Sequence, residues 1–517
     1  MADNLPIDVI RSHQEDRESV ASSTHNHGNS QSQTTRPEAT DDTEEKYKHD
    51  VPPDGGYGWV CIACVFWINA HTWGINSVSD TFHSYGVFLS YYLSHDVFPG
   101  ANSLSYAFTG GLSISCALLV APLATYLIHL YGIRLVLNLG VFFETLSLIG
   151  SSFATQKWHI FLSQGVCFGW GMGFLFVGSV GIAPQWFQKR RGVAMGITAS
   201  GSGLGGLMYS LAVGAIIPRY GLGWAFRILG IISCVVNLVC ANLLRDRNKL
   251  VGSRFSPFHA PLLRKPEFIL FLGWGFFSML GYVALLFSVA NFALSVGLSA
   301  HQGSVVSALL NLGQGLGRPF VGMFSDTFGR INIATFLSFM CGLFCLVIWV
   351  FADSMGVVCF FAVLVGTVSG TYWATVSPVL VEIIGLRDLP SGLSINWLWL
   401  VAPCTVSEAI ALELRRPTAS GGTSYLHVQL FTGFMYVAGS ICLWIVRGWK
   451  IGELQRAEQK QQSAVRREPL TGNGGDGEKK NSPDDVPATL QPGEDMEMSS
   501  VWTPFNLTRQ MFALERV

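Results

Sequence analysis

The sequence "NLGQGLGRPFVGMFSDTFGR", residues 311–330, decides the fold because it places a lone arginine within a long apolar region. It is followed directly by "INIATFLSFMCGLFCLVIWVF", residues 331–351, and two more apolar runs precede it. One crossing of a bilayer core takes roughly 20 apolar residues in a helix. Arg318 therefore falls inside a predicted membrane helix, where a charge costs about 2.5–3.5 kcal/mol on insertion scales and usually faces a cavity or a partner.

The composition indicates a membrane protein through the middle of the chain. Of 517 residues, 50% are hydrophobic and 13% are charged, whereas a soluble protein carries roughly 25% charged residues. The formal net charge of −1 gives no indication of a nucleic-acid partner. We therefore predict an all-α protein embedded in a lipid bilayer, with twelve transmembrane helices. These are expected near residues 59–79, 104–128, 134–154, 158–183, 193–217, 223–244, 268–294, 302–324, 331–352, 356–384, 391–413 and 425–447.

The charges divide the chain and orient it. Residues 1–53 hold eleven acidic against five basic residues and, like residues 450–517, are predicted to be disordered tails. An even number of crossings puts both tails on one side, where the predicted loops hold twelve Lys and Arg residues against four on the other. The positive-inside rule then places both termini in the cytosol. The plasma membrane is the first expectation, and the vacuole or another endomembrane is the alternative.

The longest predicted internal loop separates two sets of six helices. The expected domains are a cytosolic tail (1–53), a six-helix bundle (54–244), a cytosolic central loop (245–267), a second six-helix bundle (268–449) and a second cytosolic tail (450–517).

A short motif recurs across the central loop. The second half contains Gly-x-x-x-Asp-x-x-Gly-Arg, formed by Gly322, Asp326, Gly329 and Arg330, and residues 125–134 of the first half contain a degraded copy. Duplicated halves of this kind build many secondary transporters, with the solute site near the midplane. Gly322 permits close helix contact, while the two charged side chains can bind neighbouring helix ends and latch one conformation. An ordinary charged turn is the alternative interpretation.

Two further motifs stand at the start of the first predicted helix and between the fourth and fifth. The first is "PPDGGYGW", residues 52–59, in which a turn is expected to cap the first helix and the tryptophan to lie at headgroup level. The second begins "WFQKRRG" at residue 186 and is expected to anchor its loop at the inner leaflet. The residues concerned are Asp54, Gly55, Gly56 and Trp59, and Lys189, Arg190 and Arg191.

Together these features resemble the major facilitator superfamily, and within it the fungal branch of the monocarboxylate transporter family, over residues 52–449. The resemblance implies two six-helix halves that alternate access to a central site. It also implies that Arg318, which precedes Pro319, belongs to a site for substrate and proton. The sequence departs from animal members that cotransport lactate and a proton: Gln314 stands where they carry an acid, and Ser77 where they carry a lysine.

Several polar and aromatic residues stand at the depth expected for a solute cavity. A guanidinium matches a carboxylate geometrically, and the lining suits a solute with an apolar or aromatic body and a polar end. The alternatives are an arginine that snorkels to the headgroups and polar residues that join helices. The candidate solute-binding residues are Arg318, Gln314, Asn311, Asn69, Trp73, Asn76, Tyr372 and Asn396.

Proton coupling, if present, needs a group other than Gln314. Glu144, about ten residues into the third predicted helix, is the first candidate, and His71 is the weaker one. A structural pairing of Glu144 with a neighbouring helix is an equal alternative. Residues 78–83 interrupt the stretch that resembles the family; they lengthen or bend the outer end of the first predicted helix, or they are an error in the gene model.

These features favour a secondary active transporter for a small organic solute, with a monocarboxylate-like anion as the first expectation. Efflux of a fungal secondary metabolite and uptake of an aromatic or flavin-type solute such as riboflavin are the alternatives, and a sensor that does not transport is a third. An enzyme is not expected, since neither HExxH nor GxSxG occurs. No cofactor or metal is expected either. The stretch "GSGLGG", residues 201–206, matches Gly-x-Gly-x-x-Gly, but within a membrane helix it indicates helix packing.

Overall fold

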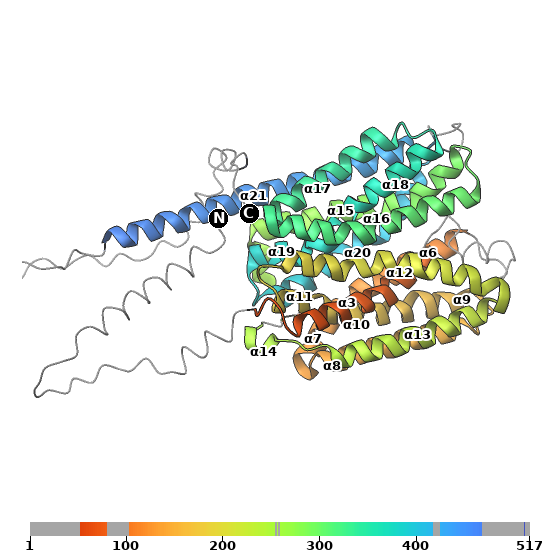
Figure 1. Ribbon diagram of the computed structural model, residues 1–517, viewed down its shortest axis with the longest axis horizontal. Coiled ribbons are helices and arrows are strands. Elements are labelled where there is room, and N and C mark those ends of the chain that lie inside the picture. Colours follow the sequence, from red (N-terminus) through yellow and green to blue (C-terminus); the bar gives the residue numbers. More distant parts are fainter. Residues whose placement is uncertain are drawn as a thin grey trace, which may run out of the picture. The chain divides into compact units, whose positions relative to one another are not determined.

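The computed structural model describes residues 52–79, 103–253, 256, 259–416, 424–467 and 511, and these residues form helices joined by short turns, without a strand among them. The predictions for residues 1–51 and for most of the C-terminal tail lie outside the described residues, as do residues 80–83 of the interruption. Figure 1 shows the helices running side by side along one common direction.

The first six predicted spans are helical, and several of them are interrupted. The interruptions fall at Thr72 in the first span, at Val120 in the second and at Gly181 in the fourth. The helices are α3 (Gly58–His71), α4 (Trp73–Ser79), α6 (Ser103–Leu119), α7 (Ala121–Tyr131), α8 (Ile133–Ser151), α9 (Lys157–Ile160), the π-helix η1 (Phe161–Cys167), α10 (Phe168–Val180), α11 (Ile182–Trp186), α12 (Arg191–Tyr220) and α13 (Leu222–Leu243).

The second half follows two short helices in the central loop, α14 (Asn248–Val251) and the 3₁₀ helix η2 (Ala260–Arg264). Its last helix continues well past the predicted end at residue 447, so residues 450–467 are helical and the prediction of disorder was wrong there. The helices are α15 (Pro266–Ser295), α16 (Ala300–Phe328), α17 (Arg330–Phe344), the π-helix η3 (Cys345–Trp349), α18 (Met355–Ser369), α19 (Thr371–Ile384), α20 (Leu389–Leu414) and α21 (Leu426–Arg467).

Eleven helical spans in the described residues are long and apolar enough to cross a membrane, and they match eleven of the twelve predicted spans. The twelfth is α16, which has 29 residues but a lower hydropathy because it carries Asn311, Gln314 and Arg318. α16 packs against α12, α15 and α18 as the other spans pack against their neighbours. Among the twelve membrane spans, the one with the lowest hydropathy is therefore the one that carries Arg318.

The two sets of helices meet in two regions. α12 of the first set packs along α16 and α19 of the second, and α6 and α7 of the first set pack along α20. The repeated motif makes α7 and the end of α16 equivalent, and in both copies a glycine with positive φ follows the helix: Gly132 at 82° and Gly329 at 99°. The chain reversals at these two points are therefore alike, although the sequences have diverged.

Glycines bring α12 into close contact with two neighbours. A Cβ atom on Gly201 would lie 2.1 Å from the carbonyl oxygen of Phe66 in α3. A Cβ atom on Gly196 would lie 2.3 Å from the carbonyl oxygen of Arg318 in α16. The "GSGLGG" stretch thus lies inside a helix and packs on α3, as the sequence indicated.

Gly201→Ala is expected to destabilise the fold, because an added methyl group meets backbone atoms that cannot move independently. Overpacking of this kind costs about 1–3 kcal/mol. Thermal unfolding of the detergent-solubilised protein measures it as a lowered Tm. Gly111→Ala in α6 is the matched control, since nothing lies within 4 Å of a Cβ atom there. Equal Tm values for the two variants would contradict the tight contact at Gly201.

Candidate functional site

A cavity lies between the two sets of helices, about halfway along them. It holds about 1190 Å³ of atom-free space, including the part open to solvent. One wall comes from α3, α4, α6, α10 and α12, and the other from α15, α16, α19 and α20. Six of the eight candidate solute-binding residues line it: Asn69, Trp73, Asn76, Asn311, Gln314 and Arg318.

Arg318 lies in the cavity wall and is only 2% exposed. Its Nη1 donates to the carbonyl oxygen of Ala199 at 2.6 Å and to the hydroxyl of Ser202, both on α12. Its Nη2 donates to Gln314 Oε1 at 2.8 Å and to the Tyr282 hydroxyl at 3.3 Å. These contacts hold the guanidinium between the two halves, so it does not reach toward the headgroups.

The charge of Arg318 has no acidic partner among the described residues. The described ion pairs all lie elsewhere, and every acceptor on the guanidinium is neutral. Its Nε is buried without a hydrogen-bond partner in the same part of the chain. A buried cation in this state is costly, and an anion in the cavity would lower that cost.

Gly370 explains how the guanidinium is placed. It separates α18 from α19, and a Cβ atom there would lie 2.5 Å from Arg318 Nε. Any side chain at this break would displace the guanidinium. The position of Arg318 therefore depends on a glycine 52 residues later in the sequence.

Aromatic rings close the cavity toward the end where α12 begins and α16 ends, which we call the tail side. Trp73 of the first half lies 5.2 Å from Trp373 of the second, measured between ring centroids. Phe176 lies 5.0 Å from Trp397. A second, smaller cavity beyond these rings is lined by Val180 and Trp397 together with residues of α7, α11 and the start of α20. A thin aromatic layer therefore separates the two cavities.

Tyr372 and Asn396, the other two candidates, do not line the cavity. The Tyr372 hydroxyl donates to Asn396 Oδ1 at 2.9 Å, and both side chains are buried. Tyr372 packs against Trp274 and Trp373, so the pair lies behind the aromatic layer. They join α19 to α20 within the second half.

The two candidates for proton coupling also lie outside the cavity lining. Glu144 on α8 is 1% exposed, and its Oε2 accepts a hydrogen bond of 2.7 Å from Asn237 on α13. His71 ends α3 and is hydrogen-bonded through Nδ1 to the Tyr209 hydroxyl on α12. Both groups belong to the first half, whereas Arg318 belongs to the second.

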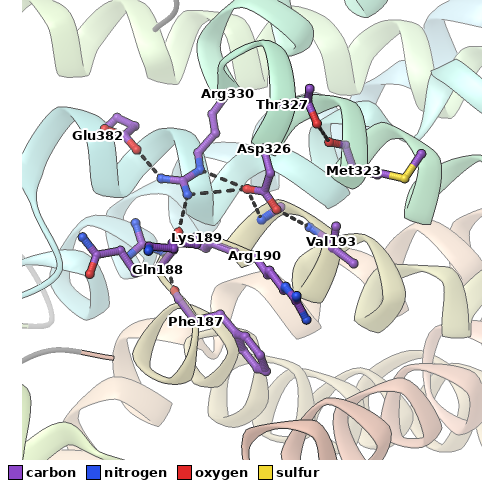
Figure 2. Close-up of polar contacts among 12 residues, drawn as sticks. Phe187, Gln188, Lys189, Arg190, Val193, Met323, Asp326, Thr327, Arg330 and Glu382 are labelled. Carbon is purple, nitrogen blue, oxygen red and sulfur yellow. Dashed lines mark hydrogen bonds and ion pairs between the residues drawn. The ribbon is translucent and has the colours of Figure 1, made fainter. Parts of the chain in front are cut away.

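The repeated motif joins the two halves on the tail side, as Figure 2 shows. Asp326 Oδ1 accepts from the backbone N–H of Gly192 at 2.8 Å, and Oδ2 accepts from that of Val193 at 2.9 Å, at the start of α12. Arg330 pairs with Glu382 on α19 and donates to the carbonyl oxygen of Gln188 at 2.6 Å. The carboxylate thus caps a helix of the opposite half.

Glycine permits this contact. A Cβ atom on Gly322 would lie 2.1 Å from the carbonyl oxygen of Gly192, and one on Gly192 would lie 2.5 Å from that of Gly322. The backbones of α12 and α16 therefore touch beside Asp326. Gly329 has φ of 99° and ends α16, which turns Arg330 toward Glu382.

The two motifs that carried the family resemblance pack on each other. Asp54 Oδ1 accepts from the backbone N–H groups of Gln188 at 2.7 Å and Lys189 at 2.8 Å, in the segment just before α12. The predicted cap on the first helix, α3, is not formed by a side chain. Trp59 contacts the Phe187 ring edge-on at 4.8 Å between centroids. No pattern in the sequence indicated that these segments, more than 120 residues apart, would meet.

The remaining residues of these motifs have different surroundings. Gly55 and Gly56 form the turn that holds Asp54, and Gly56 has φ of 61°. Lys189 and Arg190 are exposed, in keeping with a loop at the membrane surface. Arg191 is 5% exposed, and its Nε donates to the carbonyl oxygen of Phe187 at 3.0 Å. Arg191 therefore lies inside the protein, whereas Lys189 and Arg190 are placed where the predicted anchoring at the inner leaflet requires them.

Comparison with known proteins agrees with this architecture. The family model described as "Major Facilitator Superfamily" matches residues 59–400. The chain belongs to the Major Facilitator Superfamily. Members of this superfamily move small solutes across membranes, and the chain is a multi-pass membrane transporter of that kind and not an enzyme.

Two yeast proteins and a fungal efflux protein illustrate its similarity within the superfamily. "Probable transporter MCH2" of Saccharomyces cerevisiae is 35% identical over 421 residues, which cover 80% of this chain and 88% of that protein. "Uncharacterized transporter ESBP6" of the same yeast is 32% identical, covering 78% of this chain and 60% of that protein. "Fujikurins efflux protein" of Gibberella fujikuroi is 26% identical, covering 79% of this chain and 87% of that protein.

Proposed function

We propose that this transporter carries a small monocarboxylate-like organic anion. The observation that carries the proposal is Arg318, a buried guanidinium in the cavity wall without an acidic partner among the described residues. A carboxylate would supply the missing charge and an acceptor for the unpartnered Nε. Gln314 beside it is neutral, so the site does not neutralise its own cation.

The rest of the lining suits an apolar or aromatic body attached to that carboxylate. Trp73, Phe176 and Trp373 form one end of the cavity, and Phe287 and Leu286 lie in the wall that the second half contributes. Polar groups at Asn69 and Asn311 line its sides, and the Nδ2 of Asn69 donates to the carbonyl oxygen of Thr198 at 2.9 Å. Pockets of this composition bind a ligand by apolar contact and orient it by a few polar groups.

Alternating access would use the two contacts between the halves that lie on the tail side of the cavity. In the observed conformation Asp326, Arg330 and the aromatic layer close that side. Opening requires the helix start at Gly192 to leave Asp326. If the tails are cytosolic, as the loop charges predict, this conformation is the one closed to the cytosol.

Export of a fungal metabolite is the second candidate, because a relative covering most of both chains is named as an efflux protein. The same site serves both directions, since alternating access is reversible and the driving gradient sets the net flux. The two candidates therefore differ in the solute and not in the mechanism.

Counterflow in proteoliposomes tests the proposal independently of direction. The vesicles are loaded with unlabelled lactate, pyruvate, benzoate or phenylacetate, and uptake of the labelled compound is measured. Each acid is paired with its primary amide, which has nearly the same shape without the charge. Carboxylates are expected to exchange and to compete, and the amides are not. Exchange of the amides, or of riboflavin, at the same rate as the acids would overturn the assignment of an anion site.

A further inference from the structure

The described part of the first half contains a buried carboxylate that solute binding does not use. Glu144 stands at the middle of α8, and its Oε1 has no hydrogen-bond partner among the described residues. Its Oε2 is bonded to the amide of Asn237, which is also fully buried. No described lysine, arginine or histidine forms an ion pair with it. A charged carboxylate in these surroundings is costly, so the neutral acid is the favoured form.

The helices around Glu144 pack closely against it. A Cβ atom on Gly171 of α10 would lie 2.5 Å from the backbone nitrogen of Glu144. From α13 the facing group is the Asn237 amide, and from η1 the Cys167 thiol donates to the carbonyl oxygen of Phe143 next to it. From α12 the Tyr209 hydroxyl lies within electrostatic reach of the carboxylate. None of these facing groups carries a positive charge, so the protonated acid is the form in which Glu144 is neutral where it stands.

Tyr209 connects α12 to the end of α3 beside the solute cavity. Its hydroxyl is hydrogen-bonded to Nδ1 of His71, and the Nε2 of that histidine is buried without a described partner. His71 is the last residue of α3, where the helix is interrupted before α4. Asn69 on one side of the interruption and Trp73 on the other both line the cavity. A change at His71 therefore acts on the two helix ends that form the cavity wall.

We propose that Glu144 is the proton-carrying group of this transporter, linked through Tyr209 and His71 to the α3–α4 interruption. The inference rests on the proposed function, since it assigns the ion that drives the same solute flux. A proton binds one carboxylate oxygen of Glu144 to form the neutral acid and later leaves the same oxygen. The charged form, which needs water or a cation, favours the conformation that opens the first half around it.

The test separates coupling from solute transport. Glu144→Gln keeps the volume and the hydrogen bond to Asn237 but carries no exchangeable proton. We expect it to lose accumulation driven by a pH gradient by at least about tenfold, while carboxylate counterflow stays within about twofold of wild type. Glu408→Gln is the matched control, because Glu408 on α20 is also buried, at 7% exposed, with Oε1 unpartnered among the described residues. It is expected to keep both activities.

A second readout does not depend on flux. Infrared difference spectra between acidic and alkaline buffer should contain the carbonyl band of a protonated carboxyl group that Glu144→Gln loses and Glu408→Gln retains. Accumulation by Glu144→Gln at the wild-type level would overturn the inference, and so would equal loss of accumulation and counterflow. Wild-type accumulation of the carboxylate that does not respond to a pH gradient would overturn it while leaving the proposed function intact. Absence of carboxylate counterflow in the wild type would overturn both.

Discussion

Arg318→Lys is expected to reduce carboxylate counterflow by roughly 30- to 160-fold. Lysine keeps the charge but cannot hold Ala199, Ser202, Gln314 and a solute carboxylate at once, because it has a compact ammonium group in place of a planar fork. The loss of hydrogen bonds to a charged group costs about 2–3 kcal/mol, which converts to that factor at about 1.4 kcal/mol per tenfold. Initial rates of labelled-acid exchange measure it.

Arg227→Lys is the matched control for this prediction. Arg227 lies on α13 against the rings of Phe153 and Trp224, and its Nε donates to the Ser152 hydroxyl, outside the cavity. The carboxylate exchange rate of Arg227→Lys is expected to stay within about twofold of wild type. If Arg318→Lys exchanges carboxylates at the full rate, the guanidinium does not recognise the solute.

Two neighbours of Arg318 extend the test. Gly370→Ala is expected to lower exchange as well, because the new methyl group would displace the guanidinium from its place 2.5 Å away. Gln314→Glu would place a carboxylate where the amide oxygen now lies 2.8 Å from Nη2. The internal ion pair would compete with a solute anion, so the apparent KM for carboxylates should rise while the protein stays folded. An unchanged KM would show that the anion binds elsewhere.

Asp326→Asn is expected to open the tail side of the transporter. The amide keeps one acceptor, but its NH₂ group would face the N–H of Val193 or Arg330, where the structure has an acceptor. Charge-assisted hydrogen bonds contribute about 1.5–3 kcal/mol each. The closed conformation should therefore lose roughly tenfold or more in population relative to the open one.

Cys404 can measure this change, because it lines the cavity and is 3% exposed. In a variant that keeps Cys404 as its single cysteine, a membrane-impermeant thiol reagent on the tail side should react slowly, and Asp326→Asn should speed the reaction about tenfold. Thr327→Val is the matched control, since the hydroxyl of Thr327 is bonded only within its own helix, to Met323, as Figure 2 shows. An equal reaction rate in all three proteins would mean that Asp326 does not hold the halves together.

The positions of the helices and the burial of Arg318 within one of them could be predicted from the sequence, because both depend on local composition. Apolar runs of about 20 residues mark membrane spans wherever they occur, and a charge among them marks a buried polar site. The hydropathy of α16 is lower than that of the other spans because a helix that lines a cavity needs a polar face. The helical extension of α21 also had a local signal that the prediction of disorder overlooked: residues 453–467 contain neither Gly nor Pro.

Contacts between distant segments could not be predicted in the same way. Helical periodicity tells which residues share a face, but not which neighbour that face meets. Tyr372 and Asn396 were placed in the cavity for their polarity, and they bind each other behind Trp373. Asp54 was expected to cap its own helix, and it caps the segment before α12. Tyr209, which is hydrogen-bonded to His71, was not identified from the sequence at all.

The glycine contact between α12 and α16 has a consequence for how fast the halves can move. Side chains that interlock must leave their rotamers before two helices can shift, which makes most packed interfaces switch between discrete arrangements. At Gly192, Gly196 and Gly322 the facing surfaces are bare backbone. Once the hydrogen bonds of Asp326 to the start of α12 break, few side chains at this contact have to change rotamer. We therefore expect a low barrier to the movement of one half relative to the other.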